Sequence, residues 1–380
     1  NHSVINFIYW SKLVRNVGVA KIMKLEIDTK NPVLVTGGNG YVGSWVVQKL
    51  LDKGLTVHVT VRDIKDKNKT DHLQNMSVKS KGTIKLFEAD LLVQGSFEKA
   101  MKTCDTVFHT AAPFNWKYTD ATKEFYHPVV DGTKNVLETV NKTKSVKTVI
   151  YTSSGFAVYG DNADIALTPS GTLNEDCWNT SSTLDHNPYS YCKATAEKLA
   201  WDYANKQKNW VLKVINPVNP VGATKSGFST SGTHELYVQL GNGAMKSGAP
   251  PVEFGIVDIE DVADAHVNAA FNKKASGRFL IFGEAMSLLD LANILREKFG
   301  EKYPIPKKEM PKWLVWLVAP LLDKTLSRKY IGKNMGYAWK GDNSKSINEL
   351  GMKYRPIKSS AVAMFQQMID NDFSFGQKKV

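Results

Sequence analysis

The chain has 380 residues, an apolar fraction of 42% and a formal net charge of +12. This length and composition are typical of a folded protein with one large domain and a smaller second lobe, and they exclude a disordered or fibrous chain. No nucleic-acid-binding motif accompanies the excess of lysine, so we interpret it as a solubility feature and expect no nucleic-acid partner. The three cysteines have spacings that indicate neither a disulfide framework nor a zinc site. We therefore expect a reducing, cytoplasmic setting and no bound metal.

Residues 1–30 are predicted to form an N-terminal extension. Residues 1–24 carry four basic and no acidic side chains, which fits an organellar targeting peptide or residues upstream of a natural start at Met23. The longest apolar run, residues 313–322, is too short to span a bilayer. We predict a buried or lobe-packing helix there, with interfacial membrane contact as the alternative and no stable membrane insertion.

From residue 33 onward, short β-branched runs alternate with helical stretches. This alternation predicts an α/β fold, a Rossmann-type doubly wound parallel sheet covered by helices on both faces. The expected strands are 33–36, 55–61, 84–88, 106–110, 146–152, 211–215 and 277–283; the expected helices are 41–53, a short one near 96–102, 119–143, 188–206 and one beginning around 257–263. Residues 217–250 have the Pro, Gly, Ser and Thr content of loops.

The first expected strand runs directly into Thr36-Gly37-Gly38-Asn39-Gly40-Tyr41-Val42-Gly43, and an expected helix follows. Strand, glycine loop and helix form the context of a dinucleotide-binding fingerprint, although an ordinary glycine-rich turn is the alternative. Gly37 would permit the tight turn, Gly40 the approach to a pyrophosphate and Gly43 close helix packing. The amides that open the helix would meet the phosphate charge. The predicted cofactor contacts of this loop are Thr36, Gly37, Gly40, Tyr41, Val42 and Gly43.

These patterns predict a division of the chain into two parts. Residues 31–216 with about 256–285 would form the dinucleotide-binding domain. Residues 217–255 and 286–380 would form a smaller, mostly helical substrate lobe. Such a lobe would close over the carboxyl ends of the strands, where an α/β sheet binds its ligand.

The second expected strand ends in Val61-Arg62-Asp63. A carboxylate at this point binds the ribose of NAD, whereas an arginine accommodates the 2′-phosphate of NADP. Arg62 therefore favours NADP(H), while Asp63 leaves NAD(H) open. The lysines at 65, 67 and 69 either add to the attraction or lie on a solvated surface loop.

Tyr189 and Lys193 are four residues apart, a spacing that places two side chains on one face of a helix. Asn187 and Pro188 precede them, as a helix cap and a first-turn proline would. An ammonium group beside a phenol favours the charged phenolate, so we expect Lys193 to lower the pKa of Tyr189 from about 10. Tyr191 lies away from Lys193 because only two residues separate them.

With both motifs present, the chain resembles the extended short-chain dehydrogenase/reductases, and more narrowly the dihydroflavonol reductases and bacterial aldehyde reductases. The resemblance runs from Val33 to about Ile369. Further segments that support the resemblance are 61–63, 89–91, 107–113, 131–137, 151–155, 175–178 and 354–356.

The resemblance implies a catalytic set of Ser154, Tyr189 and Lys193. It also implies cofactor contacts along the ends of the strands. Asp90 and Leu91 would contact the adenine; Thr110, Ala111 and Ala112 would line the nicotinamide ribose; Thr152, Lys193, Pro217 and Val218 would complete the cofactor site.

One position departs from the plant flavonoid reductases, which have a substrate-binding asparagine where this chain has Tyr159. A simpler aldehyde or ketone is therefore expected as the small-molecule substrate, reduced by NADPH to an alcohol. Hydroxysteroid dehydrogenation, sugar-nucleotide epimerisation or dehydration with NAD, and a non-catalytic NADP sensor remain as alternatives. The expected walls of the substrate pocket are Phe114, Trp116, Tyr159 and Tyr237, and a monomer or homodimer is expected.

Overall fold

A single parallel sheet of seven strands organises the first two thirds of the chain. The computed structural model describes residues 28–113, 118–227, 231–323 and 325–371. The strand order is β3-β2-β1-β4-β5-β6-β9, and every neighbouring pair is parallel. Their bounds are β1 (Val33–Thr36), β2 (Thr56–Val61), β3 (Thr83–Glu88), β4 (Thr106–His109), β5 (Thr148–Thr152), β6 (Val211–Pro217) and β9 (Gly277–Ile281). This is the Rossmann order with one added strand, so the predicted fold class is confirmed.

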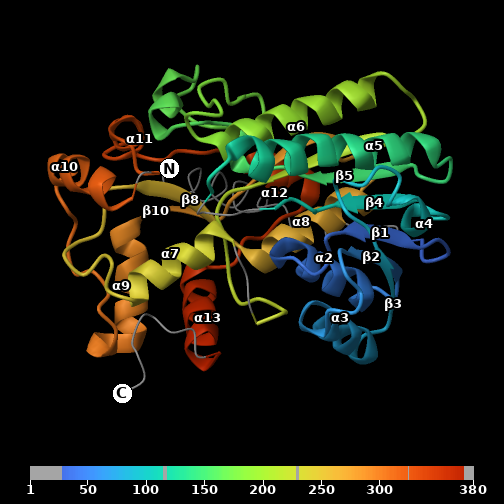
Figure 1. Cartoon of the computed structure of the whole chain (residues 1–380), viewed down its shortest axis with the longest axis horizontal. Coiled ribbons are helices and arrows are strands. Elements are labelled where there is room, and N and C mark those ends of the chain that lie inside the picture. The colour runs from blue at the N-terminus through green and yellow to red at the C-terminus, as the bar shows by residue number, and fades with distance from the viewer. Residues whose placement is uncertain (1–27, 114–117, 228–230, 324, 372–380) are drawn as a thin grey trace, which may run out of the picture.

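Helices cover both faces of the sheet (Figure 1). On one face lie α2 (Tyr41–Asp52) and α8 (Ile259–Phe271); on the other lie α5 (Gly132–Lys142) and α6 (Pro188–Asn205). Side chains alternate between the faces of a strand. Accordingly, Val33 and Val35 of β1 are buried in the core with α2 and α8, whereas Leu34 is buried with α5 and α6.

Two helical segments in this half differ from the prediction. A helix that was not predicted, α3 (Lys67–Lys79), follows β2 and contains two of the lysines for which a solvated surface loop was one interpretation; it is anchored by the buried side chains of Thr70, Leu73 and Met76. The expected helix 119–143 begins as a π-helix over Thr122–Asp131 before it continues as α5. Pro128 lies inside the π-helical part and has no amide hydrogen to donate, which accounts for the wider turns. The expected short helix is α4 (Glu98–Met101).

The later part of the chain adds a second, three-stranded sheet and several helices. The sheet has the order β10 (Glu284–Ser287), β8 (Glu253–Asp258), β7 (Pro220–Val221). The helices are α7 (Gly232–Gly241), α9 (Leu288–Phe299), α10 (Lys312–Leu322), α11 (Arg328–Asn334), α12 (Ser344–Leu350) and α13 (Ile357–Asp370), and 3₁₀ turns cover Gly155–Ala157, Asn162–Leu167 and Gly300–Lys302. Helix α7 lies in the segment expected to be loops; Ser231 caps it by accepting a hydrogen bond from the His234 amide. The assignment of two domains stays a prediction.

Residues 313–322, predicted to form a buried or lobe-packing helix, lie in helix α10, which is not buried but packs against α11. Of its side chains only Val315 is buried, while Trp313 is 67% and Leu322 82% exposed. The helix lies at one end of the long axis of the molecule, where it packs with α11 (Figure 1). Among the described residues, no helix is long and apolar enough to cross a membrane.

Candidate active site

The glycine loop between β1 and α2 has the shape that a pyrophosphate requires. Gly37 has a φ of +65°, and a Cβ atom on it would lie 2.8 Å from the Cα atom of Ala111. A Cβ atom on Gly43 would lie 2.4 Å from the carbonyl oxygen of Gly37. Side chains at these positions would clash with the backbone of the turn, which the Gly40 amide closes by donating to the Gly37 carbonyl oxygen at 2.9 Å. The first amides of a helix such as α2 have no carbonyl partner within the helix and can bind an anion. The residues present therefore fit a dinucleotide cofactor.

Thr36 fixes this loop to the end of the neighbouring strand β4. Its hydroxyl group lies 2.8 Å from His109 Nδ1 and accepts a hydrogen bond from the Ala111 amide at 3.2 Å. Its carbonyl oxygen accepts a hydrogen bond from the Thr110 hydroxyl at 2.7 Å. Burial, followed by the charge of Lys193, lowers the pKa of His109 to about 3. His109 is therefore a neutral structural histidine at the meeting point of β1 and β4, rather than a base.

At the end of β2, Arg62 and Asp63 are both exposed. The Asp63 carboxylate accepts a hydrogen bond from the Lys65 amide at 2.8 Å, which holds it against its own loop. The Arg62 guanidinium has no hydrogen-bond or ion-pair partner among the residues that the structure describes. The hydrogen bond to the Lys65 amide uses one carboxylate oxygen, so both charged side chains are accessible to a ligand at the carboxyl end of β2.

The loop that follows β3 carries Asp90 and Leu91, the predicted adenine contacts. The Asp90 carboxylate accepts a hydrogen bond from the Leu92 amide at 2.8 Å. Asn135 of α5 donates to the carbonyl oxygens of Leu91 and Val93 at 3.0 and 2.9 Å, and its own oxygen accepts from the Gly95 amide. Asn135 thus determines the path of this loop, a role that the sequence alone did not reveal.

Helix α6 begins where the sequence predicted, with Asn187 as its N-cap residue and Pro188 in its first turn. The Asn187 side chain does not cap the helix. It donates instead to the carbonyl oxygen of Gly160 at 3.0 Å and to the Asp161 carboxylate at 2.9 Å, and its φ is +57°. Asp161 is itself buried and also accepts from His186 at 2.8 Å. A buried carboxylate therefore fixes the start of the helix that carries Tyr189 and Lys193.

The Lys193 ammonium group is buried against the end of β5. Its Nζ atom donates to the carbonyl oxygen of Thr152 at 2.8 Å and lies 5.5 Å from the centre of the Tyr151 ring. Burial lowers the pKa of Lys193 to about 8, an effect that the negative charge of Glu197 opposes. Thr152 comes two residues before Ser154. The contact therefore brings α6, which carries Tyr189 and Lys193, next to the end of β5, which leads to Ser154.

Tyr189 lies one helical turn before Lys193 and is half-buried. The ring of Phe125, from the π-helix, packs edge-on against it with the centroids 5.8 Å apart. Burial raises the pKa of Tyr189 well above its ordinary value, with a smaller contribution from Cys192. The expectation that Lys193 lowers this pKa is therefore wrong: the ammonium group is held by the carbonyl oxygen of Thr152.

Ser154 is 9% exposed and begins the 3₁₀ turn that follows β5. Its hydroxyl oxygen accepts a hydrogen bond from the Phe156 amide at 3.2 Å, and its carbonyl oxygen accepts from Asn216 at 3.0 Å. Val218 packs beside this turn, since a Cβ atom on Gly155 would lie 2.6 Å from the Val218 side chain. The ends of β5 and β6 are thus packed together at Ser154.

Behind these residues lies a buried ionic cluster that the sequence did not predict. The Glu197 carboxylate is 0% exposed and accepts hydrogen bonds from Arg278 at 2.5 Å, Asn216 at 2.7 Å and Ser153 at 2.5 Å. Arg278 also donates to the carbonyl oxygens of Glu175 and Cys177. The cluster connects α6 with Ser153 after β5, with the end of β6 and with the start of β9. The only hint of this cluster in the sequence is the position of Glu197, four residues after Lys193 and so on the same buried face of the helix.

The predicted substrate-pocket residues are placed as follows. Tyr159 is 3% exposed and packs near the rings of Phe156 and Trp339. Tyr237 is 0% exposed in the core that also contains Phe365. Phe114 and Trp116 lie outside the described residues. Their role in the pocket stays a prediction.

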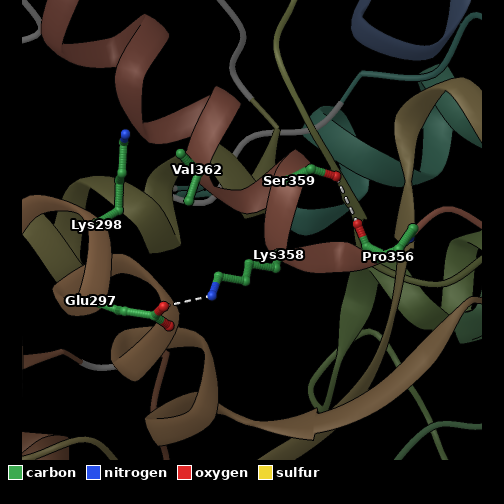
Figure 2. Close-up of a pocket in the computed structure, with 6 residues that line it drawn as sticks. All are labelled: Glu297, Lys298, Pro356, Lys358, Ser359 and Val362. Atoms are coloured by element: carbon green, nitrogen blue, oxygen red, sulfur yellow. Dashed lines mark hydrogen bonds and ion pairs between the residues drawn. The ribbon is translucent and has the colours of Figure 1, made fainter.

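A separate surface pocket lies between α9 and α13 (Figure 2). Its walls are formed by Glu297, Lys298, Pro356, Lys358, Ser359 and Val362. The ion pair between Glu297 and Lys358 spans it at 2.6 Å. None of the candidate catalytic or cofactor residues lines it, and it is not part of this site.

Comparison with known proteins decides the family. A family model described as the NAD dependent epimerase/dehydratase family matches residues 33–281. The chain belongs to this family. Within it, the chain is an extended short-chain dehydrogenase/reductase related to the dihydroflavonol reductases.

Several curated relatives of this epimerase/dehydratase family member are named as reductases. Cinnamoyl-CoA reductase 1 from Petunia hybrida is 38% identical over 279 residues, which cover 73% of this chain and 79% of the relative. Dihydroflavonol 4-reductase from Gerbera hybrida is 33% identical, with 75% of this chain and 76% of the relative covered. The crystal structure of Gre2 with NADPH from Candida albicans is 27% identical, has a TM-score of 0.70, and covers 90% of this chain and 99% of its own. The chain is therefore an enzyme of the NAD(P)-dependent oxidoreductase family.

Proposed function

We propose that the protein reduces an aldehyde or ketone to the alcohol with NADPH. The observation that carries the proposal is the contact of Lys193 with Thr152, which places the Tyr189 helix beside Ser154 at the carboxyl end of β5. Ligands of doubly wound sheets bind at this edge. The glycine loop after β1 opens at the same edge, next to β4.

The proposed roles follow from the state of each side chain. When bound, the nicotinamide cofactor supplies the hydride. Tyr189 would donate the proton to the developing alkoxide, and since burial raises its pKa, the phenol holds that proton at neutral pH. Ser154 would polarise the carbonyl oxygen of the substrate through a hydrogen bond. Lys193 would hydrogen-bond the ribose hydroxyl groups while it remains bonded to the carbonyl oxygen of Thr152.

Two observations support NADPH over NADH. The Arg62 side chain is exposed at the end of β2, whereas the Asp63 carboxylate is engaged with the Lys65 amide. A structural relative, Gre2 from Candida albicans, has been solved in complex with NADPH. A guanidinium group binds a 2′-phosphate through charge-assisted hydrogen bonds that the 2′-hydroxyl of NADH cannot provide to the same extent.

The substrate proposed here is smaller and simpler than a flavonoid. Tyr159 replaces the asparagine of the plant flavonoid reductases, and its ring is buried near Phe156 and Trp339. It therefore cannot supply the amide hydrogen bonds of an asparagine. The relatives named cinnamoyl-CoA reductases make an acyl-CoA thioester a necessary comparison compound.

The proposal is tested by following NADPH and NADH oxidation with one compound of each class: an aliphatic aldehyde, an aromatic aldehyde, a ketone, a steroid, a dihydroflavonol and a cinnamoyl thioester. We expect turnover of an aldehyde or ketone with NADPH and a lower kcat/KM with NADH. A protein that purifies with NAD bound and oxidises neither cofactor would instead support an epimerase or dehydratase.

A further inference from the structure

Six large apolar side chains of one short helix face solvent together. They are Trp313 (67% exposed), Trp316 (43%), Leu317 (49%), Val318 (37%), Leu321 (80%) and Leu322 (82%), and we call them the α10 patch. Other exposed apolar residues, such as Val78 and Leu167, are isolated on separate elements. Scattered apolar side chains are ordinary on a protein surface, but a contiguous group indicates a binding surface.

None of the described residues covers this patch. The helix itself is attached to the rest of the fold through its one buried side chain. Val315 packs in a small core with Ile331 and Met335, which join α10 to α11. The helix lies at the end of the molecule farthest from β3 (Figure 1), and of its side chains only Val315 is buried. Helix α10 has 11 residues, so it is about 16 Å long, too short to cross a bilayer but sufficient to lie within its surface layer.

The chain segments on either side of α10 are basic in sequence. Between residues 307 and 333 the described cations are Lys307, Lys308, Lys312, Arg328, Lys329 and Lys333, whereas the acids are Glu309 and Asp323. Lys307 is paired with Glu301 at 2.6 Å, Lys333 lies 3.9 Å from the Asp161 carboxylate, and Lys312 donates to the carbonyl oxygen of Gly332 at 3.0 Å. The Arg328 guanidinium lies 4.7 Å from the Trp316 ring, so positive charge reaches the edge of the apolar surface. This charge pattern is complementary to a negatively charged partner.

From this combination we propose that the α10 patch docks on the surface of an anionic lipid bilayer. Indole rings favour the boundary between headgroups and acyl chains, and flanking lysines and arginines bind acidic headgroups. A second copy of the chain fits less well, because two-fold contact would bring the two basic rims together. Residues 1–24 of the chain also fit less well as the partner, because they carry four cations and no acid and would not complement the positive charge beside the patch.

Co-sedimentation of the full chain with vesicles tests this proposal. We expect binding to vesicles of phosphatidylcholine and phosphatidylserine at 7:3, weaker binding to pure phosphatidylcholine, and release by high salt. The double variant Trp316→Ser/Leu321→Ser should lower the partition coefficient about tenfold or more. Arg328→Glu/Lys329→Glu should lower it about tenfold on the anionic vesicles alone.

The matched control is Leu167→Ser, which removes a leucine that is 83% exposed on a different element. It should bind anionic vesicles like the unaltered chain. Thermal unfolding of all variants checks that they are folded, since each change lies at an exposed position. Vesicle binding is measured without enzymatic activity, so its result does not depend on whether the proposed reduction is correct.

Three outcomes would overturn the proposal. The first is absence of binding to anionic vesicles by the full chain. The second is binding that the serine variant leaves unchanged. The third is concentration-dependent self-association, measured by sedimentation velocity, that the serine variant abolishes without any vesicle binding; this result would assign the patch to a second copy of the chain.

Discussion

Arg278 donates to Glu197 at 2.5 Å and so joins the last strand of the main sheet to the helix that carries Tyr189 and Lys193. Both side chains are buried, and the same carboxylate accepts from Ser153, next to Ser154. Lys193 and Glu197, one turn apart on α6, therefore make different contacts. The Lys193 ammonium group bonds to β5, and the Glu197 carboxylate bonds to β6 and β9. The candidate catalytic residues are held by this ionic framework as well as by apolar packing.

Removing the carboxylate from this framework should destabilise the fold strongly. Glu197→Ala leaves the Arg278 charge buried without its partner, and loss of one member of a buried ion pair costs about 3–5 kcal/mol. The control is Asp202→Ala on the same helix, where the exposed pair with Lys206 should contribute less than about 1 kcal/mol. Urea unfolding measures both free energies. Equal losses for the two variants would contradict the structural importance of Glu197.

Replacing Arg62 should change the choice of cofactor. Arg62→Ala removes a guanidinium group proposed to bind the 2′-phosphate, so the KM for NADPH should rise about tenfold to a hundredfold and that for NADH by less than about twofold. Lys69→Ala is the control, because Lys69 pairs with Asp66 at 3.0 Å. Steady-state kinetics with each cofactor gives the answer. A parallel rise in both values would remove Arg62 from phosphate recognition.

Removing the Tyr189 hydroxyl should separate proton donation from cofactor binding. For Tyr189→Phe we expect turnover to fall about 10²- to 10³-fold while the Kd for NADPH changes little. Tyr191→Phe, two residues along the same helix, should retain turnover. Fluorescence titration and initial rates measure the two quantities. Near-normal turnover by Tyr189→Phe would exclude this residue as the donor.

Two buried histidines should make the fold sensitive to mild acid. Burial lowers the pKa of His266 to about 4 and that of His109 to about 3, from 6.5. The unfolded chain therefore binds more protons below about pH 6.5, and stability falls as the pH falls through this window. Urea unfolding at pH 7 and pH 5 should show the loss, with a smaller difference in His266→Gln. An unchanged difference in that variant would contradict the contribution of His266.

The sequence predicted those parts of the fold that depend on local patterns. Strand β1, the glycine loop and α2 follow one another with the expected spacing, because apolar runs and glycines act over a few residues. Helix α3 escaped prediction because only Thr70, Leu73 and Met76 anchor a mostly polar segment. The start of α6 at Pro188 was predictable for the same local reason as the glycine loop.

Features that depend on contacts between residues far apart in the sequence could not be predicted. Arg278 meets Glu197 across 81 positions of sequence, and no local pattern pairs them. The raised pKa of Tyr189 reflects tertiary burial, which overrides the four-residue spacing to Lys193. Helix α10 has an apolar sequence all round, yet whether such a helix is buried depends on the neighbours that the fold supplies.

The hydrogen bond from Lys193 to the carbonyl oxygen of Thr152 has a consequence for the entropy of binding. A free lysine side chain has four flexible torsions, and ordering it costs up to about 2 kcal/mol. Here the protein's own backbone orders the side chain during folding. A dinucleotide that engages the ammonium group would meet a preorganised donor, so this ordering cost would not weaken its affinity.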